Sequence, residues 1–440
     1  MRRSFLFLPL VIGCLLATSS LAAEEETFGP SQWTQYRINA SNNAVFDNGA
    51  EPLPRMMFRT GDQVRATPVV VGNALYIGNH ASGGMFRFDL PSGKVAWDDD
   101  NPWYRHAPNW IHSEMIQADG RIFVGYGNRA FQNGKLRGTG ESGVMAVNPE
   151  NGETLWNHHT EGEVMPTPAL WNGTLYIVTG GGKLIALSPD SGERRWSIDL
   201  PGWVSMSSPA IKDGVLYVGS LDSVVAIDLQ RQETLWTFER QASFTDVPPA
   251  VSEDGIVVIT AMVEPNKLTE EQARQYSSHR GYFHFIYAFD ADSGDLLWSD
   301  LLGSGPQQDN NTSGAPVIAD GSVYVGSPYT WSFFAYDLKS GERRWEYPVG
   351  AKIKGAPAIV DGKVIFGDTA GFLHMLNAME GKTPACEHRA GKLKVGGSNS
   401  GGPNVALAPG GPIVINRTVF VGSHDRFVHA IPLKLLECRE

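Results

Sequence analysis

The sequence predicts an all-β fold, an eight-bladed β-propeller of four-stranded antiparallel blades. One phrase recurs along the 440 residues at a period of roughly 40, which indicates stacked copies of one supersecondary unit. Asp-Gly and Asn-Gly turns punctuate the copies, and most copies end in a Trp. Radial repetition of small sheets leaves only short, protected edges, so these observations favour a propeller over a β-sandwich.

The repeat opens with a Pro that is followed ten positions later by a Gly, and five of the eight copies keep both residues. These five are Pro68 and Gly78, Pro209 and Gly219, Pro316 and Gly326, Pro357 and Gly367, and Pro412 and Gly422. Three copies are degenerate: Met115 replaces the Pro before Gly125, Val178 replaces the Gly after Pro168, and Ile259 replaces it after Pro249. The count is therefore eight.

Within a copy, two short β runs are joined by a tight turn such as Asp361-Gly362, whose residues tolerate positive φ angles. A third run leads to a second turn, such as Ser340-Gly341, and then to a fourth run. The fourth run ends in a Trp in six copies: Trp97, Trp156, Trp196, Trp236, Trp298 and Trp345. We expect each ring to dock one blade on the next, with its N–H donating to a backbone carbonyl.

The two ends of the chain are expected to close the ring. The eighth copy runs out after its third strand, and residues 55–60 offer the missing outer strand, with Phe58 in the place that a Trp fills elsewhere. In the seventh copy Cys386 stands where the Trp is expected. The predicted organisation is a signal peptide over 1–23, an extension over 24–51, the propeller over 52–432 and a tail over 433–440.

The N-terminus indicates export. A basic start, an apolar stretch and small residues at 20–23 read as a secretory signal peptide, which places the protein in the periplasm. Val11-Ile12-Gly13-Cys14 also matches a lipoprotein box, so lipidation of Cys14 and anchoring to the outer membrane is the alternative. In an oxidising compartment Cys386 and Cys438 are expected to form a disulfide; two unconnected thiols are the other interpretation.

Composition excludes some partners. The formal charge of −11 is a poor match to a phosphate backbone, so nucleic acid is not expected. After the signal peptide no apolar run is long enough to span a bilayer. We expect a monomer, and no metal-ligand spacing is readable; His158 and His159 are adjacent on a predicted strand and point to opposite faces.

The departures from the repeat gather on one predicted face. Long segments join strands two and three at 126–142 and 263–280, and long inter-blade connections occur at 98–113, 302–314 and 391–411. Loops on a rigid scaffold commonly carry function, so we expect this loop-rich face to be the functional one. Thr269 and Gln272 form a capping-box pattern, which predicts a short helix over that face.

The central mouth on that face is predicted to be rimmed by residues just ahead of the inner strands. These are His112, Trp203, Asp246, Asn310, Asn311, Lys352, Lys354 and Asn399. Such a funnel could hold a small polar or anionic ligand, or a protein partner could bind the face around it. Polar side chains at a wet pore mouth also need no ligand.

The unit Gly-x-Leu-Tyr-Val-Gly, followed by Ala-Ile-Asp-Leu and Trp236, together with Trp33-Thr34-Gln35-Tyr36-Arg37, resembles the PQQ-type propeller repeat superfamily over roughly residues 31 to 432. One branch, the quinoprotein dehydrogenases, implies pyrroloquinoline quinone with Ca²⁺ on the axis. Asp246 would then be a base, Trp203 a stacking platform and Lys354 a quinone contact. The chain has neither a Cys-Cys pair nor a Cys-x-x-Cys-His haem motif.

Two other branches imply different functions. BamB-like propellers are exported lipoprotein subunits of the outer-membrane assembly machinery and hold no cofactor. Tetrathionate-hydrolase-like propellers use a single pore carboxylate. The resemblance therefore leaves open whether the chain is an enzyme. We expect a periplasmic binding or scaffold protein, with a quinoprotein oxidoreductase as the first alternative and a tetrathionate-hydrolase-like pore enzyme as the second.

Overall fold

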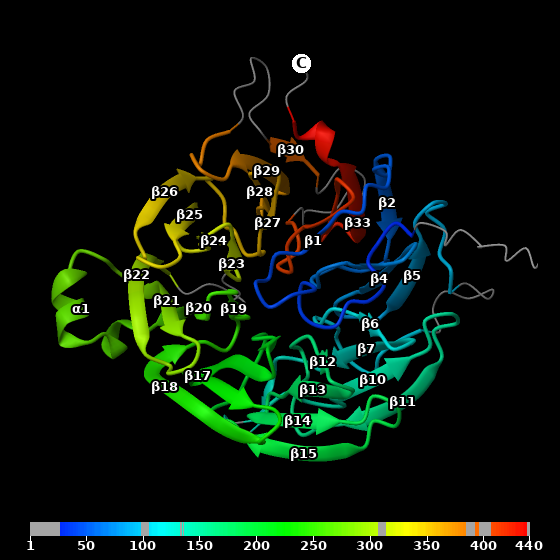
Figure 1. Ribbon diagram of the computed structural model, residues 1–440, viewed down its shortest axis with the longest axis horizontal. Helices are drawn as coiled ribbons and strands as arrows, with labels where there is room; N and C mark the ends of the chain where they lie inside the picture. Colours follow the sequence, from blue (N-terminus) through cyan, green and yellow to red (C-terminus); the bar gives the residue numbers. More distant parts are fainter. Residues whose placement is uncertain are drawn as a thin grey trace, which may run out of the picture.

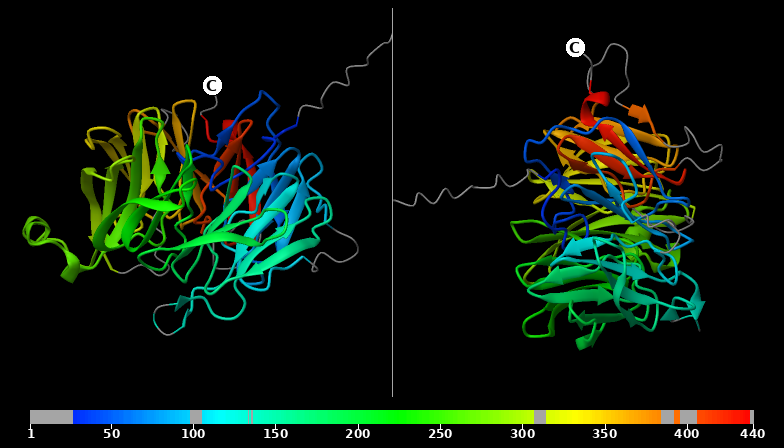
Figure 2. Two further views of the ribbon diagram at one scale, coloured as in Figure 1. Left: turned by 60° about the horizontal axis from the view of Figure 1, so that its bottom comes forward. Right: turned by 90° about the vertical axis from the view of Figure 1, so that its right-hand side faces the viewer.

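The small sheets of the protein are arranged in a ring around one axis (Figure 1). The computed structural model describes residues 27–97, 105–132, 134, 136–306, 314–383, 392–395 and 406–437. Grouped by sequence repeat, the strands form small antiparallel units that follow one another around the ring. Figure 2 shows this ring from the side. The predicted all-β propeller is therefore confirmed, and the strand order is compatible with eight blades.

The strands of the first four units follow the chain in order. They are β3 (Val69–Val71), β4 (Ala74–Gly78) and β5 (Met85–Asp89); β6 (Ile116–Ala118), β7 (Arg121–Tyr126), β10 (Gly143–Val147) and β11 (Thr154–His159); β12 (Ala169–Trp171), β13 (Thr174–Val178), β14 (Lys183–Leu187) and β15 (Arg194–Asp199); and β16 (Ala210–Lys212), β17 (Val215–Asp228) and β18 (Glu233–Ser243). In the first unit a single bridge between Phe88 and Val95 stands for the fourth strand. In the fourth unit β17 covers the second and third positions.

The strands of the last four units complete the ring. They are β19 (Ala250–Val251), β20 (Ile256–Val263), β21 (Tyr282–Asp290) and β22 (Leu296–Gly305); β23 (Val317–Ala319), β24 (Ser322–Gly326), β25 (Ser332–Asp337) and β26 (Arg343–Pro348); β27 (Ala358–Val360), β28 (Lys363–Gly367), β29 (Phe372–Asn377) and β30 (Lys392–Lys394); and β31 (Ile413–Ile415), β32 (Thr418–Gly422) and β33 (Phe427–Pro432). A short 3-10 helix, η3 (Leu433–Leu435), follows β33.

The ring closes through the two ends of the chain, as predicted. Strand β2 (Met56–Arg59) pairs antiparallel with β33 and supplies the outer strand of the eighth unit. Strand β1 (Val45–Phe46) pairs in parallel with β31 on the inner side of the same unit. Phe58 is 1% exposed, and its ring centroid lies 5.2 Å from that of Phe88 in the first unit. A Phe ring thus packs against the next blade at the closure, without the N–H donor that a Trp supplies at five other seams.

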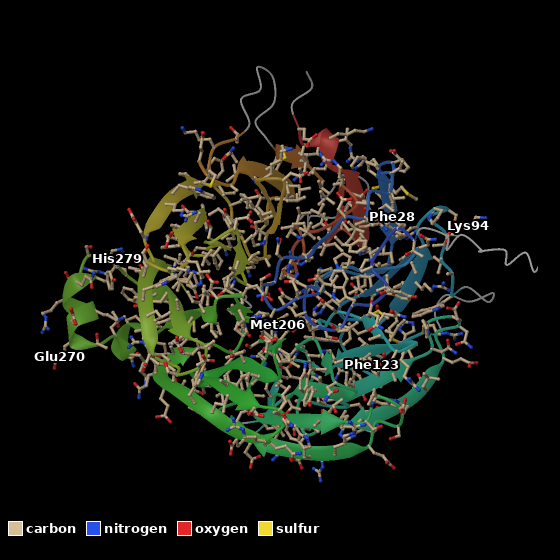
Figure 3. All side chains as sticks on the ribbon, in the orientation of Figure 1. Phe28, Lys94, Phe123, Met206, Glu270 and His279 are labelled. Carbon is tan, nitrogen blue, oxygen red and sulfur yellow. The ribbon has the colours of Figure 1, made fainter. Side chains whose placement is uncertain are left out.

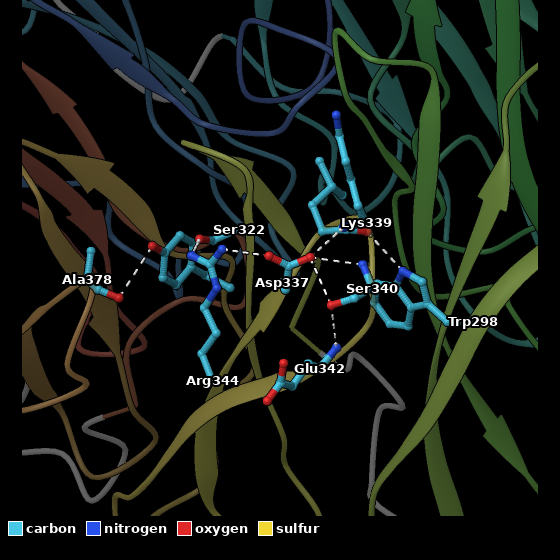
Figure 4. Close-up of polar contacts among 10 residues, drawn as sticks. Trp298, Ser322, Asp337, Lys339, Ser340, Glu342, Arg344 and Ala378 are labelled. Atoms are coloured by element: carbon cyan, nitrogen blue, oxygen red, sulfur yellow. Dashed lines mark hydrogen bonds and ion pairs between the residues drawn. The ribbon is translucent and has the colours of Figure 1, made fainter.

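Five of the six Trp residues dock neighbouring blades as expected, and Trp196 is the exception. The indole N–H donates to a backbone carbonyl of the next unit at five seams: Trp97 to Pro149, Trp156 to Pro189, Trp236 to Ala291, Trp298 to Leu338 and Trp345 to Ala378. Figure 4 shows the Trp298 seam, where Asp337 accepts the backbone N–H of Ser340 at 2.8 Å and shapes the turn that meets the ring. Each seam therefore joins burial of a large ring to a satisfied donor.

The Gly of the second turn is required at these seams. Gly294 has φ +76°, and a Cβ added there would lie 2.6 Å from Cδ2 of Trp236. Gly341 has φ +70°, and its Cβ would lie 2.5 Å from Trp298. The turn must take a left-handed conformation and also let its backbone touch an indole, and only Gly meets both requirements.

Gly294→Ala should therefore lower the free energy of unfolding by about 2 to 3 kcal/mol, because backbone strain and overpacking add together. Gly362→Ala is the matched control: φ is +67°, but no atom lies within 4 Å of the added Cβ. It should cost only about 1 kcal/mol. Guanidinium unfolding of both variants checks this, and equal losses would contradict the role given to the indole.

The N-terminal extension forms a plug across one end of the ring. It meets the inner strand of each unit in turn, through backbone and side-chain hydrogen bonds that join Pro30 to Gly72, Trp33 to Gln117, Thr34 to Leu170, Gln35 to Ile211, Ala40 to Val251, Ser41 to Ile318, Asn43 to Ile359 and Ala44 to Val414. In Figure 1 the blue segment crosses the centre of the ring. We call residues 29–46 the axial plug.

The two insertions between second and third strands carry structure of their own. The first contains a hairpin of β8 (Phe131–Gln132) and β9 (Leu136–Arg137). The second contains a 3-10 helix, η2 (Pro265–Lys267), and α1 (Glu270–Gln275), whose capping box between Thr269 and Gln272 confirms the predicted motif. The position predicted for α1 is wrong, because Figure 1 shows it beyond the rim of the ring, beside β18 and β22.

Several predictions concern residues outside the described ranges: the signal peptide, Cys14, Cys386, Cys438, Asn310, Asn311 and Asn399. Export, lipidation and the disulfide therefore stay predictions. Among the residues that the structure describes, no helix has the length and apolar character that crossing a bilayer requires.

Candidate functional site

Two layers of side chains face the axis just above the plug. Alternate residues of an extended segment point to the same side, so the positions three and one before the opening residue of each copy project together. Those three before are Arg65, His112, Met165, Met206, Asp246, Lys354 and Pro409; those one before are Thr67, Glu114, Thr167, Ser208, Pro248 and Ala315. All of them line one cavity, with Tyr36 of the plug. Figure 3 shows Met206 near the centre of the ring.

This axial cavity is small and charged. Its volume is about 40 Å³, which is room for about three water molecules. Arg65, Asp246 and Lys354 come from the first, fifth and seventh units and meet around it. Asp246 is only 9% exposed, and Nε of Arg65 is buried without a hydrogen-bond partner within the described residues. Burying a charged side chain costs free energy unless it has a polar partner, so this lining favours water or a polar ligand in the cavity.

Glu114 forms the floor of the cavity and ties it to the plug. Its Oε2 accepts the indole N–H of Trp33 and the backbone N–H of Arg37, both at 2.9 Å. Burial raises the pKa of Glu114 from 4.5 to about 7, although these hydrogen bonds and the Arg37 charge oppose the shift. The carboxyl is fully buried, so its protonation state affects stability.

The raised pKa of Glu114 predicts how the free energy of unfolding changes with pH. A raised folded-state pKa gives a stabilising contribution that is complete below the unfolded value of 4.5 and is lost as pH rises through about 7. In Glu114→Gln, Oε1 can accept both N–H groups without the charge. We expect the difference in unfolding free energy between about pH 5 and about pH 8 to shift in the variant by up to about 3 kcal/mol relative to wild type. Parallel pH profiles would contradict this assignment.

A buried pair near the cavity joins Arg137 of the first insertion to Glu163, and neither side chain lines the cavity itself. Nε of Arg137, on β9, lies 2.6 Å from Oε1 of Glu163, whose side chain is 0% exposed. Burial raises the pKa of Glu163 to about 8, with Arg137 opposing and the Asp246 charge adding to the shift. The Arg137 guanidinium also lies 5.2 Å from the ring centroid of Trp203 and 5.6 Å from that of Phe131. Glu163 and Asp246 thus form a pair of neighbouring carboxyls in different environments.

A histidine pair lies beside the cavity wall. Nε2 of His112 is 2.6 Å from Nδ1 of His80, and both side chains are buried. Burial and nearby cations, chiefly Arg65, lower the pKa of both rings, that of His80 to about 3. Both rings are therefore neutral, and one N–H proton lies in the hydrogen bond between them. Nδ1 of His112 has no hydrogen-bond partner among the described residues.

The structure brings together only some of the residues predicted for the mouth. His112, Asp246 and Lys354 line the axial cavity. Trp203 is not among the residues that line the cavity; its ring packs against the guanidinium of Arg137. No contact places Lys352 at the cavity; its carbonyl accepts the backbone N–H of Thr369.

Sequence reasoning missed five residues that matter here: Tyr36, Arg65, Glu114, Arg137 and Glu163. Arg65 and Glu114 could have been found by applying the offsets of three and one to every copy, including the degenerate second one. Tyr36 and Arg137 carry no such signal, because they come from a plug and an insertion that no repeat predicts. Glu163 is found only through its contact with Arg137.

Comparison with known proteins shows the family to which the chain belongs. The model of the PQQ_2 family, described as outer membrane protein assembly factor BamB, matches residues 140–275 and 272–434. These matches cover more than half of the chain. The protein belongs to the PQQ_2 family. The predicted resemblance to PQQ-type propellers is thereby confirmed.

Two curated relatives of this PQQ_2 chain carry different names. Tetrathionate hydrolase of Acidithiobacillus ferrooxidans is 25% identical over 93% of this chain and 87% of its own length. Outer membrane protein assembly factor BamB of Burkholderia pseudomallei is 26% identical over 84% of each chain. The structure of BamB from Moraxella catarrhalis covers 86% of this chain and 99% of that one at a TM-score of 0.61 and 16% identity. The structural likeness shows the fold alone.

The described residues do not fit pyrroloquinoline quinone on the axis. Trp203, the predicted stacking platform, is not among the residues that line the cavity, and within the described lining only Tyr36 and His112 carry aromatic rings. Groups of three or more His, Cys, Asp or Glu side chains that could hold a metal ion are absent from the described ranges. We therefore derive no role for a quinone in this PQQ_2 protein.

Proposed function

We propose that this propeller is exported to the periplasm and hydrolyses a small sulfur oxyanion of the tetrathionate class in its axial cavity. One observation carries the proposal: Arg65, Lys354 and the carboxyl of Asp246 come from three blades and surround a single closed-in space. Two cations beside one carboxyl suit a bound anion that must react with water. An inert scaffold has no need of charges in its axis, where their burial costs stability.

The residues divide the work as follows. Arg65 and Lys354 hold one oxyanion head group in the cavity, and the rest of the anion lies toward the mouth. Asp246 takes a proton from water as the water oxygen bonds to a terminal sulfonate sulfur of the anion. The bond from that sulfur to the adjacent sulfur breaks, and the cations stabilise the negative charge on the departing sulfur chain, which leaves as an anion.

Among the comparisons, the hydrolase relative supports this proposal because its match spans 93% of this chain. The experiment is direct: incubate the purified protein with tetrathionate and follow both loss of the anion and release of protons from acid to neutral pH. Saturable turnover is expected. The absence of turnover at every pH would overturn the proposal.

A protein-binding role of the BamB kind is the second candidate. The family match and the Burkholderia pseudomallei relative favour it, and the exposed rings of Phe131 and Trp331, each 47% exposed, offer apolar contacts. Affinity purification from the native envelope distinguishes the two candidates. A stoichiometric outer-membrane partner without tetrathionate turnover would favour the second; turnover in the isolated protein favours the first.

A further inference from the structure

The seam between the third and fourth units breaks the rule that the other Trp seams follow. At five seams an indole N–H donates to the next blade. Trp196 keeps its place on its own blade, with its ring centroid 5.7 Å from that of Tyr176. By position in the repeat, its acceptor should be the carbonyl of Leu229. Within the described part of the chain, the structure gives the indole N–H of Trp196 no acceptor.

The cause lies in the turn of the fourth unit. At the five regular seams the turn residue under the ring is Gly, and an added Cβ would lie 2.3 to 2.9 Å from the nearest ring atom. The fourth unit has Gln232 there, in the same left-handed conformation with φ +60°. Its side chain needs the space that the turn would otherwise leave to the indole. The turn therefore cannot close on Trp196.

A pocket of about 500 Å³ lies at this open seam, within the size range of ligand sites. Its lining includes Trp171, Asn172, Tyr176, Trp196, Gln230 and Gln232. Trp171 belongs to the end of β12 and leans over the hairpin turn of the next blade, where a Cβ on Gly214 would lie 3.1 Å from its ring. The pocket thus has an indole from each side of one blade and amides from both blades.

The chemistry of the lining selects the ligand. Indole and phenol rings offer flat apolar surface, while the amides of Asn172, Gln230 and Gln232 offer both donors and acceptors. The charged residue among the lining, Arg195, already donates to the carbonyl of Gly173 at 2.8 Å and to the Thr174 hydroxyl at 2.5 Å. Acidic side chains are absent from the described lining. A neutral ligand with one apolar face and a rim of hydroxyls fits this combination.

We propose that the open seam between Trp196 and Gln232 is a binding site for a neutral saccharide. A pyranose ring presents C–H groups on its face to an indole and hydroxyls on its edge to amides, and each hydroxyl both donates and accepts. The free indole N–H of Trp196 adds a donor. The site lies at a blade seam, outside the axial cavity, so it does not depend on the proposed hydrolysis.

The test uses the full protein with maltohexaose, cellohexaose and chitohexaose as probes, measured by tryptophan fluorescence and titration calorimetry. At least one sugar is expected to bind saturably with a dissociation constant of about 1 mM or tighter. Gln232→Gly restores the regular seam and should close the pocket, with at least about a tenfold loss of affinity and a higher Tm. Trp196→Ala should lose affinity to a similar degree.

Arg231→Gly is the matched control, because it makes the same kind of change one residue away, at a side chain outside the pocket lining. Its affinity for the sugar should equal that of wild type. The proposal is overturned if none of the three sugars binds, if Gln232→Gly binds as well as wild type, or if a polyproline peptide binds and the sugars do not. A Tm of Gln232→Gly at or above that of wild type shows that the variant is folded, so its loss of affinity is not a result of misfolding.

Discussion

Replacing Arg37 by alanine is expected to lower the free energy of unfolding by about 4 kcal/mol, the largest stability loss that we expect from any single substitution considered. The side chain is 0% exposed and sits at the centre of the axial plug. Its guanidinium donates to four backbone carbonyls, those of Asn42 at 2.8 Å, Gly410 at 3.0 Å, Pro357 at 2.6 Å and Pro412 at 2.8 Å. Truncation would leave these buried carbonyls unsatisfied at once.

The loss should be large because Arg37 joins parts of the ring that no strand pairing connects directly. Pro357 and Pro412 open the seventh and eighth units, while the amide of Asn42 donates to Pro249 and Pro316 in the fifth and sixth units, each at 3.1 Å. The plug therefore holds four consecutive inner strands at a fixed spacing around the axis. Without it, the strands lose their common partner.

Guanidinium unfolding measures the effect, and Arg417→Ala is its control. Arg417 pairs with Asp361 and Glu437, but its side chain is 42% exposed, so that loss should stay below about 1 kcal/mol. If both variants lost the same small amount, the plug would be a passive cover and not part of the fold's stability.

The ring of blades could be predicted because the sequence contains eight copies of the same repeat. The Pro-to-Gly offset, the Asp-Gly turns and the terminal Trp are local signals, and each copy repeats the information of the others. Even the closure followed from this regularity, since a missing outer strand in the last copy required one from the N-terminus. Motifs that are local in sequence and occur in many copies can be recognised in a single sequence without an alignment.

The plug could not be predicted for the opposite reason. Residues 29–46 contain no repeat, and their partners lie in all eight units, up to several hundred positions away. Trp33 and Arg37 look like ordinary surface or core residues until Glu114 and the ring of carbonyls are placed beside them. The same limit hid Arg137 and Glu163, because an insertion brings the guanidinium over a carboxyl from another blade.

One departure from the repeat was visible in the sequence but was not interpreted. Gln232 replaces the turn Gly that five other copies keep under a Trp ring. The meaning of the change requires the structure, because only there does the turn Gly prove to lie against the indole of the preceding blade. A Cβ added to Gly192 would lie 2.5 Å from the ring of Trp156. The positions that follow the repeat form the contacts between blades, and the departure at Gln232 leaves a pocket between two blades.

Asp246→Asn is expected to abolish most of the proposed tetrathionate hydrolysis, with kcat at least about 100-fold lower, because it removes the group that accepts the proton from water. The amide has the shape of the carboxyl, and Asp246 already lies in a polar cavity beside Arg65 and Lys354. Tm should therefore change little. Kinetic measurement with tetrathionate, together with thermal unfolding, separates loss of chemistry from loss of structure.

Glu253→Gln gives the matched control, since it also converts a carboxylate to an amide but at a surface side chain that is 94% exposed. Its turnover should equal that of wild type. Full activity in Asp246→Asn would show that the axial carboxyl is not the base, and would leave the charged cavity as an anion-binding site only. A protein-binding function, by contrast, should survive Asp246→Asn unchanged, because this side chain is 9% exposed and a partner on the surface has almost none of it to contact.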